Sequence, residues 1–324
     1  MTSSLRPALL LLLAFAAGAL LAGCGGDQIA RTGSGGTGIA STGGTVTGFG
    51  SVVVDGERWD DRNARVETEQ GGSVVPADPR LGQRVEIDYA TRGRAERIVV
   101  AAELIGRVSE VAAGATAPAL RVAGQWVRVN LDPDAGPLTY LQGVTSFNAL
   151  QPGDVVEVHG SARHDPALAG AVVIATRIER LPALPGGLVR VTGQVQALDV
   201  GARRFRLGDL AVTLDTAARV LPASRALANG QRVVVWSDEA VGGSAAAPTL
   251  TADAVRIVDR GGSDPARAEV AGVVSRYSAA SASFEIDGLP VNARGAVVVP
   301  ASQSLADGRY VVVSGSVENG VLQA

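Results

Sequence analysis

The chain has 324 residues, of which 29 are basic and 32 acidic, and its formal net charge is −3. Hydrophobic residues make up 46% of it, which excludes disorder along the whole chain and predicts several small domains. Every basic residue is an arginine, so a phosphate-binding P-loop, which needs a lysine, is excluded. One cysteine and two histidines leave no internal disulfide and no His-rich metal cage. We therefore predict no metal and no cofactor.

Residues 1–23 predict a secretory signal peptide. Arg6 supplies the positive start, residues 8–20 are uninterruptedly apolar, and small residues follow. The apolar stretch is shorter than the roughly 20 residues that a membrane-spanning helix needs. An ordinary cleaved signal with an incidental cysteine and an uncleaved anchor helix are the alternatives.

The signal ends in Leu21, Ala22, Gly23 and Cys24, which resembles the lipobox of bacterial lipoproteins. The resemblance implies a diacylglycerol on the Cys24 thiol, cleavage before Cys24 and acylation of the freed amine. Gly25, in place of an aspartate, favours the outer membrane of a two-membrane bacterium, with the protein facing the periplasm or the exterior. Loss of Arg6 leaves 28 basic against 32 acidic residues, a net charge of −4. Attachment must then come from the acyl chains rather than from anionic lipids.

Residues 24–43 are rich in glycine, serine and threonine and predict a flexible tether. Within them, residues 33–38 match the dinucleotide-binding pattern G-x-G-x-x-G letter by letter. No strand pattern precedes the match and no helix pattern follows it, so we do not interpret it as a nucleotide site.

The rest of the chain repeats one unit four times. Each copy opens with Gly-x-Val, at Gly44, Gly106, Gly193 and Gly272. Each then has two short apolar runs around a two-residue turn: Asp55-Gly56, Ala123-Gly124, Gly208-Asp209 and Asp287-Gly288. Asp-Gly suits a type I′ turn and Gly-Asp a type II′ turn, the two that match the twist of paired strands. The pattern predicts one β-hairpin in every copy.

Two further signatures predict two further strands in each copy. The pattern Leu-x-x-Gly-x-x-Val-x-Val occurs at residues 150–158, 227–235 and 305–313, with a shortened form at 81–87. Its apolar residues alternate with Arg84, Glu86 and Asp88 in the first copy, which predicts a half-buried strand. A closing Ala-x-x-Ile follows at residues 95–98, 175–178 and 254–257. The fourth copy stops at the matching Ala324, so we expect its last strand to be absent and the sequence to be incomplete, the alternative being an open barrel.

Five short strands with a longer connection after the third predict an all-β fold of tandem small five-stranded OB-like or Greek-key barrels. We place these barrels at residues 44–104, 105–182, 188–260 and 268–324, with linkers at 181–188 and 260–267. The combined signatures resemble the bacterial family called domain of unknown function 5666, over about residues 37–324. The resemblance is clearest in the second and third copies. It implies tandem copies in lipoproteins and no catalytic residues.

Few residues suggest chemistry, and each has a plainer interpretation. His159 and His164 are better interpreted as solvated loop residues than as zinc ligands. Residues 130–136 suggest a calcium loop, but Leu141 stands where the twelfth ligand belongs, so we predict an ordinary turn. Trp59 and Trp126 follow the hairpin turns of their copies and are expected in the core, with a sugar-stacking platform as the alternative. A mildly acidic, aromatic-poor chain gives no expectation of nucleic-acid binding.

These observations predict a non-catalytic lipoprotein of the cell envelope that acts as a binding or spacer module. Its expected partners are the membrane, through the acyl chains, and an envelope protein or glycan. Two alternatives stay open. One is an envelope enzyme that acts on glycans or peptides through two carboxylates at a barrel rim. The other is a glycan receptor that uses Trp59 and Trp126.

Overall fold

The computed structural model describes residues 40–112, 118–131, 133, 138–165, 170–258, 268–318 and 320–324. The predicted signal peptide, the lipobox with Cys24 and the predicted tether up to residue 39 lie outside the described residues, as does the predicted linker at 260–267. The described chain is almost entirely β-strand, with short 3-10 turns at Phe147–Ala149 (η2) and Pro185–Gly187 (η4). This confirms the all-β fold class.

The strands form four groups, which we call barrels 1 to 4. Barrel 1 contains β1 (Ala40–Gly48), β2 (Val52–Val54), β3 (Glu57–Trp59), β4 (Arg65–Gln70), β5 (Ser73–Pro76), β6 (Arg84–Tyr89) and β7 (Arg97–Val100). Barrel 2 contains β8 (Leu104–Ala112), β9 (Ala119–Val122), β10 (Gln125–Val129), β11 (Tyr140–Gln142), β12 (Val155–Asp165) and β13 (Gly170–Leu181). Barrel 3 contains β14 (Val189–Asp199), β15 (Arg204–Leu207), β16 (Leu210–Leu221), β17 (Arg232–Ser237), β18 (Gly242–Ser244) and β19 (Ala247–Ile257). Barrel 4 contains β20 (Ala268–Ser278), β21 (Ser283–Ile286), β22 (Leu289–Asn292), β23 (Tyr310–Glu318) and β24 (Val321–Gln323).

Each group closes on itself in one common order. The pairings run β8–β9–β10–β13–β12–β8 in barrel 2 and β14–β15–β16–β19–β17–β14 in barrel 3. In barrel 4 they run β20–β21–β22–β24–β23–β20. Barrel 1 follows the same path, with its third strand divided into β3 and β4 and a bridge between Asp60 and Arg94 beside the break. In every barrel the third strand is parallel to the last one and the other neighbours are antiparallel. Closure pairs the strand edges that an open sheet would leave free.

Two sequence predictions about the ends of the described chain are wrong. The last strand of barrel 4 is present, because β24 pairs parallel with β22 and antiparallel with β23. It has three residues, too few for the Ala-x-x-Ile signature to reveal it. The predicted tether also extends too far, because residues 40–43 belong to β1 and pair with β6 on one side and β20 on the other.

The hairpin turns have the predicted geometry. Asp55 and Gly56 have φ values of 49° and 86°, and the turns at residues 123–124 and 287–288 likewise have two positive φ values. In the turn of the third hairpin, Gly208 alone has a positive φ, of 56°, as a type II′ turn requires. Each turn folds back over the Gly-x-Val glycine of its own barrel. A Cβ atom on Gly272 would lie 2.5 Å from Cγ2 of the fully buried Ile286.

We expect Gly272→Ala to lower the free energy of unfolding by about 1–3 kcal/mol, because the added carbon overpacks barrel 4. Gly201→Ala is the matched control, since the nearest atom to a Cβ there is 3.5 Å away. Its effect should stay within about 0.5 kcal/mol. Urea unfolding of the two variants measures the difference, and equal losses would contradict the packing role of the repeated glycine.

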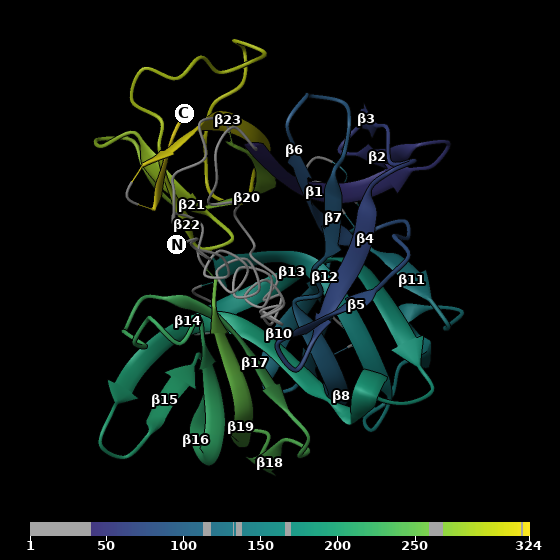
Figure 1. The fold of residues 1–324 in the computed structure, drawn as a ribbon, viewed down its shortest axis with the longest axis vertical. Coiled ribbons are helices and arrows are strands. Elements are labelled where there is room, and N and C mark those ends of the chain that lie inside the picture. Colours follow the sequence, from purple (N-terminus) through teal and green to yellow (C-terminus); the bar gives the residue numbers. More distant parts are fainter. Residues whose placement is uncertain are drawn as a thin grey trace, which may run out of the picture.

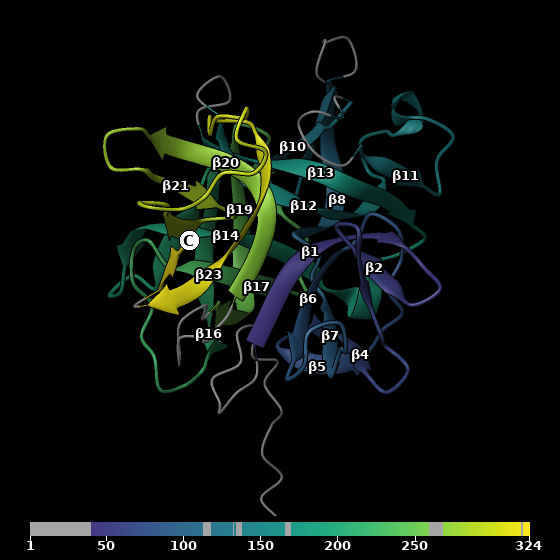
Figure 2. The same cartoon turned by 90° about the horizontal axis from the view of Figure 1, so that it is seen from above.

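The barrels pack two by two rather than as separate beads (Figures 1 and 2). Barrels 1 and 4 join through the parallel pairing of β1 with β20, and barrels 2 and 3 join through the antiparallel pairing of β8 with β14. Each pairing merges two barrels into one sheet of 12 strands. Figure 1 shows barrels 1 and 4 in the upper half and barrels 2 and 3 below them. Segments distant in sequence therefore lie side by side.

The cores show two kinds of contact between barrels. One continuous apolar cluster, which includes Leu104, Ile178, Phe205 and Leu250, fills barrels 2 and 3 together. Barrels 1 and 4 each have their own cluster, around Trp59 and around Phe284. Barrels 2 and 3 are thus fused by apolar packing. Barrels 1 and 4 reach their neighbours largely through polar side chains on the outer faces of their strands.

Candidate binding site

The outer strand faces carry charged residues that are buried between barrels. The prediction that β6 is half-buried is wrong, because Arg84 and Asp88 are each only 8% exposed although they alternate with core residues. Both of these faces of the strand are covered, one by the core of barrel 1 and the other by neighbouring side chains. Buried charges need partners, so the position of each barrel is tied to that of the next.

The most buried of these groups is a triad that joins barrels 1 and 3. The carboxylate of Glu69 on β4 lies 2.6 Å from Nη2 of Arg256 and 3.8 Å from Nη1 of Arg190. All three side chains are at most 5% exposed. Burial lowers the pKa of Arg190, and the charge of Glu69 opposes that shift. The guanidinium of Arg190 also lies 5.4 Å from the ring centre of the buried Trp236, which adds a cation–π contact.

Barrels 1 and 4 are clamped by two reciprocal contacts made by their hairpin turns. Asp287, in the turn of barrel 4, accepts a hydrogen bond from Nη2 of Arg84 at 2.8 Å. Asp55, in the turn of barrel 1, accepts one from the hydroxyl of Tyr310 at 2.8 Å. Arg84 and Tyr310 open the fourth strands of their barrels, so equivalent positions serve equivalent roles. Burial, with the charge of Asp55, raises the pKa of Tyr310, which keeps its hydroxyl a donor.

His159 contradicts the expectation of a solvated loop. It is 0% exposed within β12, and its Nε2 lies 2.6 Å from Oε1 of Glu157. Its Nδ1 lies 3.2 Å from the carbonyl oxygen of Ala101 and 3.3 Å from the backbone nitrogen of Arg84. This histidine therefore fixes barrel 2 against barrel 1. His164 lies in the same strand, but its side chain is outside the described residues.

This contact predicts a pH dependence of stability. Burial favours the neutral carboxyl of Glu157, but the hydrogen bond and charge of His159 outweigh it and lower the pKa from 4.5 to about 2. A carboxyl whose pKa is lower in the folded than in the unfolded protein stabilises the fold at pH values above its unfolded-state pKa. That contribution is lost as the pH falls towards the folded-state pKa. We expect Glu157→Gln to be less stable than the wild type at pH 6, with the difference shrinking between pH 4.5 and about 2. Urea unfolding at several pH values tests this, and a pH-independent difference would contradict it.

A groove of about 500 Å³ runs between barrels 1 and 3. It is lined by β4 and β5 of barrel 1 and by Arg219 and Leu221 at the end of β16. Pairing places Glu67 opposite Pro76 and Glu69 opposite Val74, so these four side chains share one face of the β4–β5 hairpin. Because Glu69 is bound by barrel 3, this face is turned towards barrel 3. The groove volume lies within the range of roughly 300–1,000 Å³ that small-molecule sites have.

Two contacts hold the walls of the groove. Nη2 of Arg219 donates to the carbonyl oxygen of Gly71, in the β4–β5 turn, at 2.8 Å. A Cβ on the next residue, Gly72, would lie 2.7 Å from Cδ1 of Leu221, so the turn sits directly against β16. The Glu69 triad fixes the hairpin further along. The groove is therefore preformed by the barrel packing and does not need to close around a ligand.

The groove is electropositive. Arg65 and Arg219 line it and are both exposed. Of the described residues that line it, Glu67 alone is acidic, and its carboxylate is bound by Arg97. Arg97 also lies 3.3 Å from Asp88, whose pKa is raised by burial in spite of that arginine. Two cationic side chains beside apolar Val74 and Pro76 suit a ligand with an anionic group and an apolar body.

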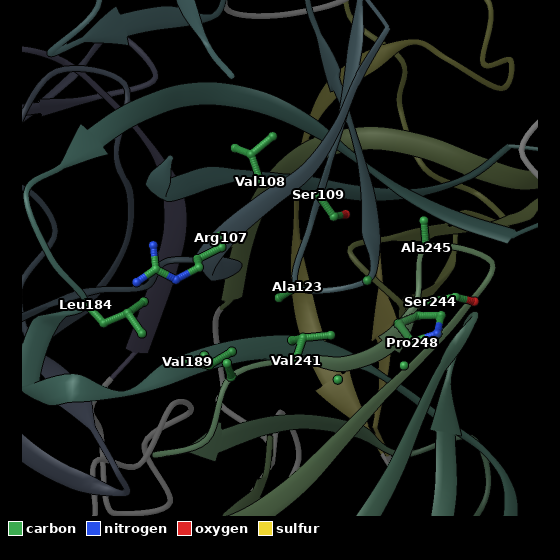
Figure 3. A pocket seen from close by; sticks show the side chains of 14 residues that line it. Arg107, Val108, Ser109, Ala123, Leu184, Val189, Val241, Ser244, Ala245 and Pro248 are labelled. Atoms are coloured by element: carbon green, nitrogen blue, oxygen red, sulfur yellow. The ribbon is translucent and has the colours of Figure 1, made fainter. Parts of the chain in front are cut away.

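A second cavity, of about 140 Å³, lies between barrels 2 and 3 (Figure 3). Figure 3 shows Arg107 and Leu184 towards one end and Ser244 and Pro248 towards the other. Its lining is mostly apolar or backbone. The space holds little more than one small ring. The groove between barrels 1 and 3 is therefore the better candidate for a binding site.

The structure does not bring the two predicted ligand-platform residues to this groove. Trp59 is 1% exposed and packs on Tyr89, with ring centroids 4.8 Å apart, which confirms the core interpretation and leaves no free face for a sugar. Trp126 is half-buried, with the guanidinium of Arg121 5.1 Å from its ring centre. Neither tryptophan lines the groove. Cys24, Leu21, Ala22 and Gly23 lie outside the described residues, and the suggested calcium loop does so in part.

Sequence reasoning missed Arg65 and Arg219, which are 154 positions apart and carry no motif. The sequence contains an indirect signal for such a site. The chain has no lysine, and arginines at outward-facing strand positions favour contacts in which one guanidinium binds several acceptors in a fixed geometry. Within the described ranges no group of three His, Cys, Asp or Glu side chains is arranged to hold a metal ion. Nor does any helix in them have the length and apolarity to cross a membrane. No protein-family model matches the chain, and no curated protein matches it either.

Proposed function

We propose that the protein is a lipid-anchored, non-catalytic binding module of the cell envelope. The single observation that carries the binding role is the preformed, electropositive groove between barrels 1 and 3. The lipobox resemblance at residues 21–24 supports the anchor, and the family resemblance over residues 37–324 agrees with a tandem-barrel lipoprotein. In this proposal the acyl chains hold the protein at the membrane, and the rigid four-barrel body presents the groove to an anionic envelope ligand.

The catalytic alternative requires two carboxylates that face one ligand with different protonation states. Beside the groove, Glu67 and Asp88 both pair with Arg97. Burial raises the pKa of Asp88, as an acid would need, but only Glu67 belongs to the groove lining. This geometry favours binding over acid–base chemistry. An acidic envelope glycan or peptide is the ligand class that matches the two arginines.

The binding role is tested with the double variant Arg65→Ala/Arg219→Ala. The probes are an oligogalacturonate and a glutamate-rich peptide, measured by titration calorimetry at two salt concentrations. Because a charged hydrogen bond contributes about 1.5–3 kcal/mol, loss of each arginine should weaken binding about tenfold or more. Arg204→Ala is the matched control, since Arg204 is exposed on β15 of barrel 3 and does not line the groove. Binding that is absent in the wild type, or equal in both variants, would overturn the groove as the site.

The anchor is tested separately with Cys24→Ala. Without the thiol no acyl chain can be attached, so metabolic labelling with a radioactive fatty acid should be lost and the protein should leave the membrane fraction. The unaltered chain is the control. A Cys24→Ala protein that still pellets with membranes would show that the anchor lies elsewhere.

A further inference from the structure

The connection between β22 and β23 ends in an exposed apolar tip. Val297 and Val299 are 86% and 83% exposed, the two highest values among the exposed large apolar residues of the described chain. Val298 between them is 37% exposed, and Pro300 follows. The sequence from residue 295 to residue 306 contains no charged side chain. Adjacent exposed apolar side chains of this kind mark contact surfaces.

The tip stands on an ordered base. Backbone turns bracket it, with hydrogen bonds from Ala296 to Ala293 at 3.0 Å and from Gln303 to Pro300 at 2.9 Å. Leu305 packs against the core of barrel 4. Asp307 accepts a hydrogen bond from the backbone nitrogen of Tyr277 at 2.8 Å, which fixes the connection to β20. A preformed tip loses little conformational entropy when its side chains are buried against a surface.

We infer that this tip inserts into the lipid surface to which the protein is anchored, so that the protein has a second membrane contact besides its acyl chains. The inference rests on the lipid anchor of the proposed function. Three consecutive valines in a stretch of twelve residues without a charged side chain suit the apolar side of a headgroup layer.

The position of the tip is compatible with the anchor. The first residues of β1 pair with the first residues of β20, since Ser41 lies opposite Ala268. The base of the tip is bound to Tyr277, nine positions further along β20, or about 30 Å away. Ala40 lies 16 positions after Cys24, and a chain of that length extends to at most about 55 Å. The tip and the anchor can therefore reach one membrane, and tethering makes a weak insertion effective through a high local concentration.

A cysteine introduced into this protein can be labelled selectively, because Cys24 is its single cysteine and the thiol of Cys24 is bound to the lipid. Val299→Cys then introduces the one free thiol, which is labelled with an environment-sensitive nitrobenzoxadiazole dye in the full-length lipidated protein. Val200→Cys is the matched control, since Val200 is 76% exposed as a lone apolar residue in the β14–β15 turn. Both proteins are reconstituted into vesicles of phosphatidylethanolamine and phosphatidylglycerol and floated on a density gradient.

We expect the dye at position 299 to brighten severalfold on vesicles and to be quenched by nitroxide-labelled lipid, while the dye at position 200 stays unchanged. Protein that floats with the vesicles but shows no response at position 299, or equal responses at both positions, overturns the inference and leaves the anchor intact. Protein that does not float overturns the anchor and the inference together. If the dye at position 299 brightens with rising protein concentration in the absence of lipid, the tip contacts a second copy of the chain, and this result also overturns the inference.

Discussion

Glu69→Gln is expected to lower the free energy of unfolding by about 3–5 kcal/mol, because it removes the buried negative charge that faces the guanidinium groups of Arg190 and Arg256. Glutamine keeps nearly the same volume, so the loss reports the charge and not a cavity. Glu69 lies on barrel 1 and both arginines on barrel 3, 121 and 187 positions away. The contact therefore contributes to holding the barrels together rather than to folding any one of them.

The control for Glu69→Gln is Glu285→Gln. Glu285 pairs with Arg276 at 3.1 Å, but the arginine side chain is 50% exposed. Solvent screens such a pair, so its loss should cost less than about 1 kcal/mol. Urea unfolding followed by circular dichroism measures both variants. If the two losses were equal, the ionic contact between barrels would contribute no more than a surface pair does.

Trp59→Ala is the second large effect, with an expected loss of about 3–5 kcal/mol. The indole is 1% exposed and lies in the cluster that fills barrel 1. Removing it leaves a cavity that Tyr89 and the surrounding valines cannot fill. Circular dichroism is the suitable probe, because the substitution removes one of only three tryptophans and alters the fluorescence.

Trp126→Ala is the matched control for Trp59→Ala. Trp126 is half-buried, with the guanidinium of Arg121 over its ring, so its loss should cost about 1 kcal/mol. The pair of variants also distinguishes a tryptophan that packs in the core from one that binds a sugar. A Trp59→Ala protein of unchanged stability that has lost glycan binding would contradict the burial of this side chain.

The sequence was sufficient to predict the local and repeated features of the fold, namely the hairpins and the common barrel. Hairpins β2–β3, β9–β10, β15–β16 and β21–β22 follow from two-residue turns whose glycines supply the positive φ that the turn requires. Four copies in one order then predict the common barrel. The repeated glycine of Gly-x-Val is explained only by the structure, which shows the hairpin folded directly over it.

The packing between barrels could not be predicted in this way. Alternation of Arg84 and Asp88 with apolar residues shows that one face of β6 is polar, but a polar face can meet water or the charges of another barrel. The same ambiguity led to the wrong placement of His159 in solvent. The groove arises at the same level, because Arg65 and Arg219 meet only when barrel 1 docks on barrel 3. No local pattern encodes that docking.

The groove and the buried ionic contacts both require the four barrels to form one packed body. Small-angle X-ray scattering of the chain without its signal and lipid tests this directly. Packed barrels predict a radius of gyration of about 19 Å, the value for a compact chain of this length. Four separate barrels on flexible linkers would give a clearly larger value. The smaller value, unchanged between low and high salt, is the result expected here, and the larger one would contradict the buried ionic contacts and the groove that they create.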